Sequence, residues 1–174
     1  MLFRSLAEVS APNPMITKWG HDIPYIYEKG ACRYWQPETL TNFDTSLHAH
    51  WMGLRMAWDP SQRPADIVDE IHARLYGNAA APMARYWRLI DEIWVNVPEY
   101  AGCGFGYLRR WDPDRLGRAR RLMNEAISAC RDDAERARVK LADDSLTAFE
   151  MLMRQRQDLA EGRWDTLADQ VAAY

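Results

Sequence analysis

The chain has little of what would place it in several common classes of protein. Its three cysteines, Cys32, Cys103 and Cys130, are far apart and cannot all pair, so they outline neither a disulfide framework nor a metal-binding pattern. No apolar run approaches the roughly 18 residues that a membrane span requires, so we expect no membrane association. The net charge is only −3, so the chain as a whole is not a polyanion binder and we expect no nucleic-acid partner.

The sequence does contain enough apolar material for a packed core. Of its 174 residues, 48% are hydrophobic, and eight Trp and eight Tyr are a surplus of aromatic side chains. This length is typical of a single domain. The first residues show no signal-peptide pattern, and residues 1–5 lead into no structural element. We interpret them as the start of a fragment, so the sequence assigns no localisation.

Residues 6–42 are rich in turn-forming residues. Four prolines and two glycines interrupt them, which disfavours a continuous helix. The run Ile23–Tyr27 combines β-branched and aromatic residues and predicts one short buried strand. We therefore expect residues 1–21 to be irregular and the strand to be followed by a loop that contains Arg33, Tyr34 and Trp35.

From residue 43 onward the apolar spacing becomes helical. Leu47, Trp51, Leu54 and Trp58 recur at the spacing of one helix face, and Asp59-Pro60 ends that helix. Further helices are predicted from Pro64 to Gly77 and from about Pro82, with a loop over 97–108. Their expected inward residues, including those of the later helices, are Ile67, Ile71, Leu75, Met83, Tyr86, Leu89, Ile90, Ile93, Leu116, Ala119, Leu122, Met123, Ala126, Ile127 and Cys130.

The last third of the chain predicts two long helices. Asp112-Pro113 has the pattern of a helix start, and Asp132 or Asp133 caps the next helix. The second helix has an apolar stripe at Val139, Ala142, Leu146, Phe149 and Met153, with the alternating spacing of a helix–helix seam. We expect the two to form an antiparallel hairpin. The predicted fold class is mainly α, with a short β and loop piece at the N-terminal end.

Three motifs in order resemble a known family. They are Trp58-Asp59-Pro60, then Tyr76-Gly77-Asn78-Ala79-Ala80, then Arg138-Val139 near the start of a long helix. Over about residues 22–160 the chain resembles the C-terminal part of uncharacterised bacterial glycoside-hydrolase-like proteins. These are catalogued as a domain of unknown function and grouped with the TIM-barrel glycoside hydrolases.

The resemblance implies a domain layout. Residues 22–60 would be the last strand, active-site loop and helix of a truncated (β/α)₈ barrel. Residues 61–174 would be a helical C-terminal domain beside that barrel. Most of the barrel would then lie outside the chain, which would have little or no activity by itself.

Glu28 is the one carboxylate that we single out for chemistry. It follows the predicted strand among aromatic residues, and barrel active sites lie at the carboxyl ends of strands. Catalysis, hydroxyl binding and an exposed strand-end role all remain open for it. Glycoside hydrolysis generally requires two carboxylates, and neither Asp22 nor Glu38 is a convincing partner.

Aromatic residues around Glu28 are candidates for ligand contact. Arg33, Tyr34, Trp35 and Tyr27 could bind a sugar, because sugar C–H faces pack on aromatic rings and Arg donates to hydroxyls. Trp19 and His21 are weaker candidates of the same kind. The alternative is that Trp35 packs between the barrel and the helical domain.

The remaining motifs predict structural roles. His48 and His50 are two residues apart on a helix and cannot chelate one ion together, and His72 is expected at the surface. The six aromatic residues at helical spacing between Trp51 and Trp94 are expected to pack in the core or between domains. The glycine-rich segment 102–106 lacks the Lys of a phosphate loop, and the arginines of 115–121 read as a solvated face. We predict neither metal nor cofactor.

Two functions remain open from the sequence. In the first, the chain is the C-terminal fragment of a glycoside-hydrolase-like protein and acts on or binds carbohydrate through the intact parent. In the second, residues 43–174 form a self-standing helical protein-interaction module. Both predict an exposed apolar surface, which could also support self-association.

Overall fold

The computed structural model describes residues 11–34, 43–96, 104–166 and 169. Within these residues it contains seven α-helices, one 3-10 turn and no strand, so the prediction of a mainly α protein is confirmed. None of the described helices combines the length and the apolar composition that a membrane span needs. In chain order the elements are α2 (Ile16–Glu28), α3 (Phe43–Trp58), α4 (Pro64–Tyr76), η1 (Gly77–Ala79), α5 (Ala80–Val95), α6 (Gly104–Leu108), α7 (Pro113–Ala129) and α8 (Asp133–Ala160).

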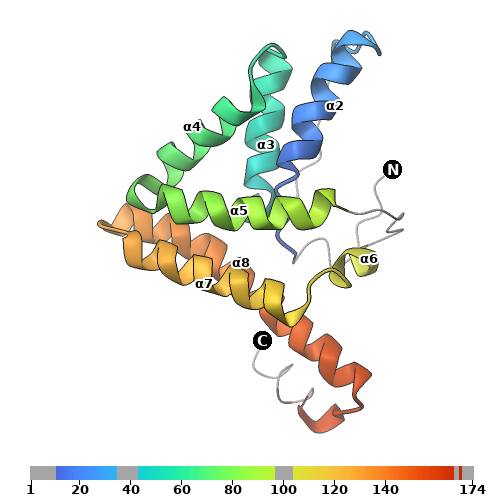
Figure 1. Cartoon of the computed structure of the whole chain (residues 1–174), viewed down its shortest axis with the longest axis vertical. Coiled ribbons are helices and arrows are strands. Elements are labelled where there is room, and N and C mark those ends of the chain that lie inside the picture. Colours follow the sequence, from blue (N-terminus) through green and yellow to red (C-terminus); the bar gives the residue numbers. More distant parts are fainter. Residues whose placement is uncertain (1–10, 35–42, 97–103, 167–168, 170–174) are drawn as a thin grey trace.

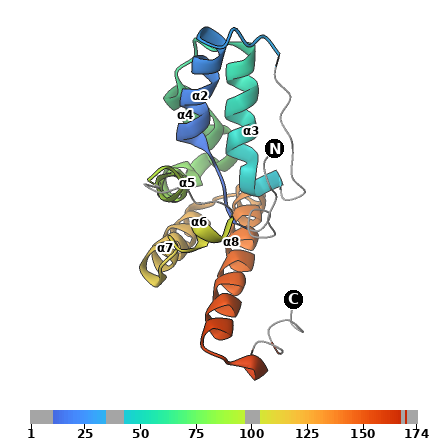
Figure 2. The same ribbon diagram turned by 90° about the vertical axis from the view of Figure 1, so that its right-hand side faces the viewer.

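The helices form two groups, and α5 lies where they meet. Figure 1 shows α2, α3 and α4 at one end of the molecule, with α5 lying across their base and α7 and α8 beyond it. In Figure 2, α2 and α3 lie side by side in the upper half, and α8 extends away at the opposite end. We call α2–α4 the small helical group and α5–α8 the large helical group.

Each group has its own apolar core. The core of the small helical group consists of four buried residues, Ile23, Met52, Met56 and Ile67. The core of the large helical group is much larger and includes the buried rings of Trp87, Trp111 and Phe149 among its members. The boundary expected between residues 60 and 61 runs between α3 and α4, which both contribute to the small core.

The predicted strand at Ile23–Tyr27 is wrong, because these residues belong to helix α2. The helix contains Pro24, which lacks an N–H group and removes one hydrogen bond from the ladder. Only Ile23 of this run is buried, while Tyr25, Ile26 and Tyr27 are exposed. The apolar run of residues 23–27 therefore packs on one helix face only, and is not a strand buried on both faces. The expectation that residues 1–21 are irregular is wrong for residues 16–21, because α2 begins at Ile16.

The start of α2 depends on a carboxylate that is distant in the sequence. Asp91 of α5 accepts hydrogen bonds from the backbone N–H of Ile16 at 2.8 Å and from both the N–H and the hydroxyl of Thr17. The first N–H groups of a helix have no partner within the helix, so a buried acceptor stabilises its first turn. Because 75 residues separate Asp91 from Ile16, no local pattern predicts this cap.

Helix α3 is confirmed, and Trp51 of the predicted face packs partly buried against the small core, but the later part of that face is wrong. Leu54 is 62% exposed and Trp58 is 91% exposed. The residues that face α2 and α4 are His48, Met52 and Met56, which are all buried. The two faces differ by about one position along the helix, roughly 100° of rotation. The flexible Met52 and Met56, rather than Leu54 and Trp58, fill the irregular space of the small core.

The turn between α4 and α5 is held by α8. Gly77 ends α4 with a positive φ of 49°, as the sequence predicts. The carboxylate of Glu135 accepts hydrogen bonds from the backbone N–H groups of Asn78 and Arg131, each at 2.8 Å. A Cβ atom at Gly77 would lie 2.1 Å from Glu135 Oε1, so glycine is required here for space as well as for φ. These hydrogen bonds lower the pKa of Glu135.

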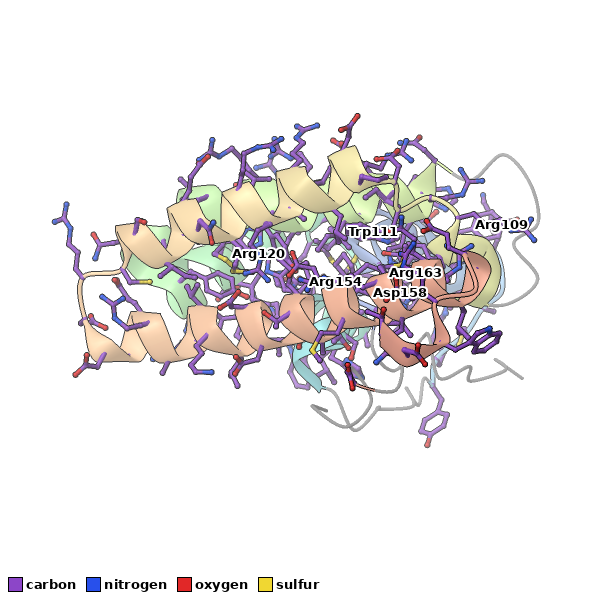
Figure 3. All side chains as sticks on the ribbon, turned by 90° about the horizontal axis from the view of Figure 1, so that it is seen from below. Arg109, Trp111, Arg120, Arg154, Asp158 and Arg163 are labelled. Atoms are coloured by element: carbon purple, nitrogen blue, oxygen red, sulfur yellow. The ribbon has the colours of Figure 1, made fainter. Side chains whose placement is uncertain are left out.

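The starts and the buried stripes of α7 and α8 are as predicted. Asp112 and Asp132 cap the two helices, accepting from Arg115 N–H and Glu135 N–H. Val139, Ala142, Leu146 and Phe149 are buried on α8, and Met153 is half-buried. The two helices contact each other, and Figure 3 shows Arg120 of α7 lying between them.

Arg120 makes the polar contact between these helices. Its guanidinium pairs with Glu150 at 2.7 Å and with Asp143, and it also donates to the hydroxyl of Thr147. At the far end of α8, Arg163 pairs with the buried Asp158 (Figure 3). Both guanidinium groups are therefore paired with carboxylates of the chain.

The loop expected over 97–108 is wrong in its last part, because Gly104–Leu108 form helix α6. Two glycines disfavour helix there, but burial outweighs that preference. The ring of Tyr107 stacks on Trp94 with centroids 3.7 Å apart, and its hydroxyl donates to the Pro12 carbonyl at 3.2 Å. Residues 97–103 lie outside the described residues.

Candidate functional site

A pocket of about 300 Å³ lies where the chain leaves α2 and passes α3. We call it the aromatic pocket. Three of the residues that the sequence singled out for ligand contact line it, namely Tyr27, Arg33 and Tyr34. Apolar side chains of α2 and α3, including Ile23 and Met56, form the rest of the lining. The lining therefore joins aromatic and cationic groups to the small apolar core.

The shape of the aromatic pocket follows from a tight reversal after α2. The backbone N–H groups of Gly30 and Cys32 both donate to the Ile26 carbonyl, at 3.1 and 3.2 Å. A Cβ atom at Gly30 would approach that carbonyl oxygen to 2.8 Å, so this close return requires glycine. Ala31 takes a φ of 50°, a left-handed conformation that most residues avoid.

Arg33 is held in place over an aromatic ring. Its guanidinium carbon lies 4.2 Å from the centroid of the Tyr27 ring. Nη1 donates to the carbonyls of Tyr27 and Cys32, at 2.9 and 3.0 Å. Guanidinium has five N–H donors, so this cation–π arrangement leaves others for a ligand. Tyr34 is 78% exposed beside it.

The other predicted site residues lie elsewhere. Glu28 is the last residue of α2 and is exposed, at a helix end rather than at the strand end that the sequence predicted. It is not among the residues that line the aromatic pocket, and no Asp or Glu of the described residues is. Trp35 lies outside the described residues, so its role stays a prediction. The described lining fits binding rather than acid–base chemistry.

Trp19 and His21, the weaker candidates, also lie outside the aromatic pocket. Trp19 packs partly buried against the small core. His21 is exposed beside Asp22, whose carboxylate also pairs with Lys18. These contacts, with the Lys18 hydrogen bond as the largest cause, lower the pKa of Asp22.

A buried histidine pair links α3 to α4. The Nε2 atoms of His48 and His72 are 3.1 Å apart, and the ring of His48 lies 4.3 Å from that of Trp87. The sequence-based expectation that His72 is a surface residue is wrong, because it is buried. Its position next to Ile71 on the apolar face of α4 was the available signal.

Burial keeps both imidazoles of this pair neutral at neutral pH. It lowers the pKa of His48 well below 6.5, with a further contribution from His72. It lowers the pKa of His72 to about 4. One Nε2 then donates to the other, and both Nδ1 atoms lack a partner among the described residues. Across those residues no three His, Cys, Asp or Glu side chains converge in a metal-binding group.

Most of the aromatic residues expected to pack do so. Tyr76, Tyr86 and Trp87 are buried, and Trp87 Nε1 donates to the Tyr76 hydroxyl at 3.0 Å. Trp51 and Trp94 are partly buried against the two cores. Trp58 is the exception, as described for α3.

Comparison with known proteins links the N-terminal half of the chain to an uncharacterised domain. No curated protein and no solved structure matches the chain. The segment that matches a family model, residues 4–88, includes the motifs at Trp58 and Tyr76, whereas Arg138-Val139 lies beyond it. Nothing in these comparisons indicates a glycoside hydrolase or a TIM barrel. Residues 4–88 match the family model described as a domain of unknown function, DUF4838.

Proposed function

We propose that this chain binds carbohydrate at the aromatic pocket and does not cleave it by itself. The observation that supports this function best is the Arg33 guanidinium, held 4.2 Å above the ring of Tyr27 next to the exposed ring of Tyr34. A ligand in the pocket would meet an aromatic surface and fixed hydrogen-bond donors at the same time.

Carbohydrate is the ligand class that this combination suits. Sugar rings present apolar C–H faces, which pack against aromatic rings, and hydroxyls, which accept from guanidinium. The volume of about 300 Å³ is at the lower end for small-ligand sites and suits one sugar unit of a longer chain. Because Tyr34 of the lining is largely exposed, neighbouring sugar units would extend over the surface.

The glycoside-hydrolase-like origin is part of this proposal, and it rests on the motif resemblance. A barrel strand is not proposed for residues 23–27, since they form α2. Glu28 is exposed and lies outside the pocket lining, in which no described residue is a carboxylate. Glycoside hydrolysis generally uses two carboxylates. We therefore expect Glu28→Gln to leave carbohydrate binding unchanged.

The test is binding of a panel of neutral tetrasaccharides to the full chain, followed by titration calorimetry with the best ligand. Tyr34→Ala and Arg33→Gln should each weaken binding about tenfold, because each removes one of the two recognition elements. Tyr25→Ala is the matched control, since Tyr25 is a 58% exposed tyrosine of α2 that does not line the pocket. The proposal fails if no tetrasaccharide binds, or if Tyr25→Ala weakens binding as much as Tyr34→Ala.

A second candidate function is protein binding through α3. Trp58 and Leu54 lie one turn apart on this helix and are both largely exposed, which is unusual for such large apolar side chains. This surface favours the helical interaction module as the alternative. Trp58→Ala should then abolish self-association in sedimentation experiments, without affecting tetrasaccharide binding. A monomeric wild-type chain at high concentration would argue against self-association.

A further inference from the structure

Two neighbouring helices direct arginine pairs toward a common cleft. Arg85 and Arg88 lie one turn apart on α5, and Arg118 and Arg121 lie one turn apart on α7. All four line a cleft of about 560 Å³ between the two helices, which lie side by side in Figure 1. We call it the arginine cleft. It shares no lining residue with the aromatic pocket.

The positive charge of the arginine cleft is only partly neutralised. Arg85 pairs with Glu125 at 2.6 Å. Arg88, Arg118 and Arg121 have no hydrogen bond or ion pair with any described residue, and Glu92 is the one further carboxylate in the lining. Four guanidinium groups against two carboxylates leave a charge of about +2, within a chain whose net charge is −3. The local charge is thus opposite in sign to that of the chain.

This accumulation of like charge is costly without a ligand. Cations one turn apart on a helix repel each other, and here two such pairs face the same cleft. In α7 and α8 the chain does neutralise a guanidinium, because Arg120 has both Glu150 and Asp143. The arginines of the cleft therefore differ from those of the helix seam in having donors left over.

The unpaired donors define the chemistry of a ligand. A guanidinium fork matches the geometry of carboxylate and phosphate oxygens and binds them in pairs of hydrogen bonds. Leu89 and Leu122, both mostly buried, form an apolar floor between the arginines. The cleft is large enough for a compact molecule that reaches arginines of both helices.

We propose that the arginine cleft binds a small ligand carrying two or more carboxylate or phosphate groups, held between Arg88 of α5 and Arg118 and Arg121 of α7. One anionic group bridges the two helices, and the other engages the remaining guanidinium. The site is independent of carbohydrate binding at the aromatic pocket, so either proposal can fail without the other.

The first test is titration calorimetry of the full chain with citrate and, separately, with tripolyphosphate at constant ionic strength. Arg88→Gln, Arg118→Gln and Arg121→Gln should each weaken binding about fivefold. Arg136→Gln is the matched control, because Arg136 is an exposed arginine of α8 outside the cleft and its loss changes the net charge equally. It should change binding less than twofold. The stronger of the two ligands distinguishes a carboxylate site from a phosphate site.

Two further variants separate a built site from general attraction of anions. Glu92→Gln removes the unpaired carboxylate and should strengthen binding about threefold. Arg121→Lys keeps the charge but loses the fork, so it should still weaken binding. The substituted side chains are exposed, so melting temperatures should not fall below the wild-type value, which reports intact folding.

Three results would overturn the proposal. The first is that neither citrate nor tripolyphosphate binds at millimolar concentration. The second is that Arg136→Gln weakens binding as much as the cleft variants do. The third is that Arg121→Lys binds the better of the two ligands as tightly as the wild-type chain does, which would indicate charge attraction without a site built from guanidinium forks.

Discussion

The two helical groups of this protein are stabilised in different ways. The large helical group has an extended apolar core in which Trp111 and Phe149 meet edge to face, with centroids 4.9 Å apart. Among the described residues, the core of the small helical group contains only four buried apolar side chains. The Asp91 cap of α2 and the contact of the His48 ring with Trp87 tie this group to α5, and the His48–His72 pair joins two of its own helices.

This difference teaches where the fold is vulnerable. Apolar burial is insensitive to pH, whereas a cap and an imidazole pair depend on specific protonation states and specific partners. Regions with few buried apolar contacts open at lower free energy than the main core. We therefore expect the small helical group to open before the large one.

The largest effect should come from the large core. Phe149→Ala removes a fully buried ring that packs on Trp111, and should lower the free energy of unfolding by about 3–5 kcal/mol. Urea unfolding followed by circular dichroism measures this loss. A loss below about 1 kcal/mol would contradict the described core.

Acid should act next, through the histidine pair. The pKa of His72 is about 4 in the fold against 6.5 in an unfolded chain, so the unfolded state binds more protons between these values. Stability is therefore complete above pH 6.5 and falls as the pH drops toward 4, by about 3 kcal/mol from His72. Burial lowers the pKa of His48 as well, which acts in the same direction.

Hydrogen exchange at pH 7 and pH 5 measures where that loss occurs. Amides of α3 and α4 should lose protection before those of α7 and α8. His72→Gln should reduce the pH dependence and leave the part due to His48, whereas His21→Gln, at an exposed histidine, should retain all of it. Glu135, whose pKa is lowered by backbone hydrogen bonds, loses its contribution only at more acid pH. Equal loss of protection in all helices would refute the proposed difference between the groups.

A smaller effect is expected from the cap of α2. Asp91→Ala removes the acceptor for two backbone N–H groups and one hydroxyl at Ile16 and Thr17. Helix caps contribute about 0.5–2 kcal/mol, and we expect a value near the upper end because Asp91 is buried. Hydrogen exchange of α2 should rise while that of α8 does not. Asp69→Ala, at an exposed aspartate of α4, is the control.

The smallest effect should follow Trp58→Ala. Because this ring is 91% exposed, its loss should change the free energy of unfolding by less than about 0.5 kcal/mol. Met56→Ala, two positions earlier on the buried face, should cost about 2 kcal/mol or more. Comparison of the two melting curves tests which face of α3 packs. A reversed order would restore the face that the sequence predicted.

Local patterns predicted α7 and α8 because several signals agree there. Asp112-Pro113 and Asp132 start α7 and α8 where the sequence placed them, and the stripe from Val139 to Phe149 is buried. In α2 and α3 the signals disagree. Pro24 and the aromatic run suggested a strand, and large side chains suggested the wrong face of α3.

Two of the three described ligand-contact candidates, Arg33 and Tyr34, follow α2 in a segment whose path no local pattern determines. Their meeting with Tyr27 depends on the reversal through Gly30 and Ala31. The arginine cleft was less visible still, because Arg85 and Arg118 are on different helices. In the sequence alone these arginines are typical of solvated helix faces, and only the packing of α5 against α7 brings them to one cleft.

The amino-acid sequence by itself determined the mainly helical class, the caps and the apolar stripes of the long helices, since these depend on residues one or two turns apart. Tertiary structure alone decided the rest. It placed Asp91 at the start of α2, brought His48 to His72, and turned Trp58 toward solvent. Each of these contacts joins residues of different helices or depends on which face a neighbouring helix covers, and local propensity carries no information about either.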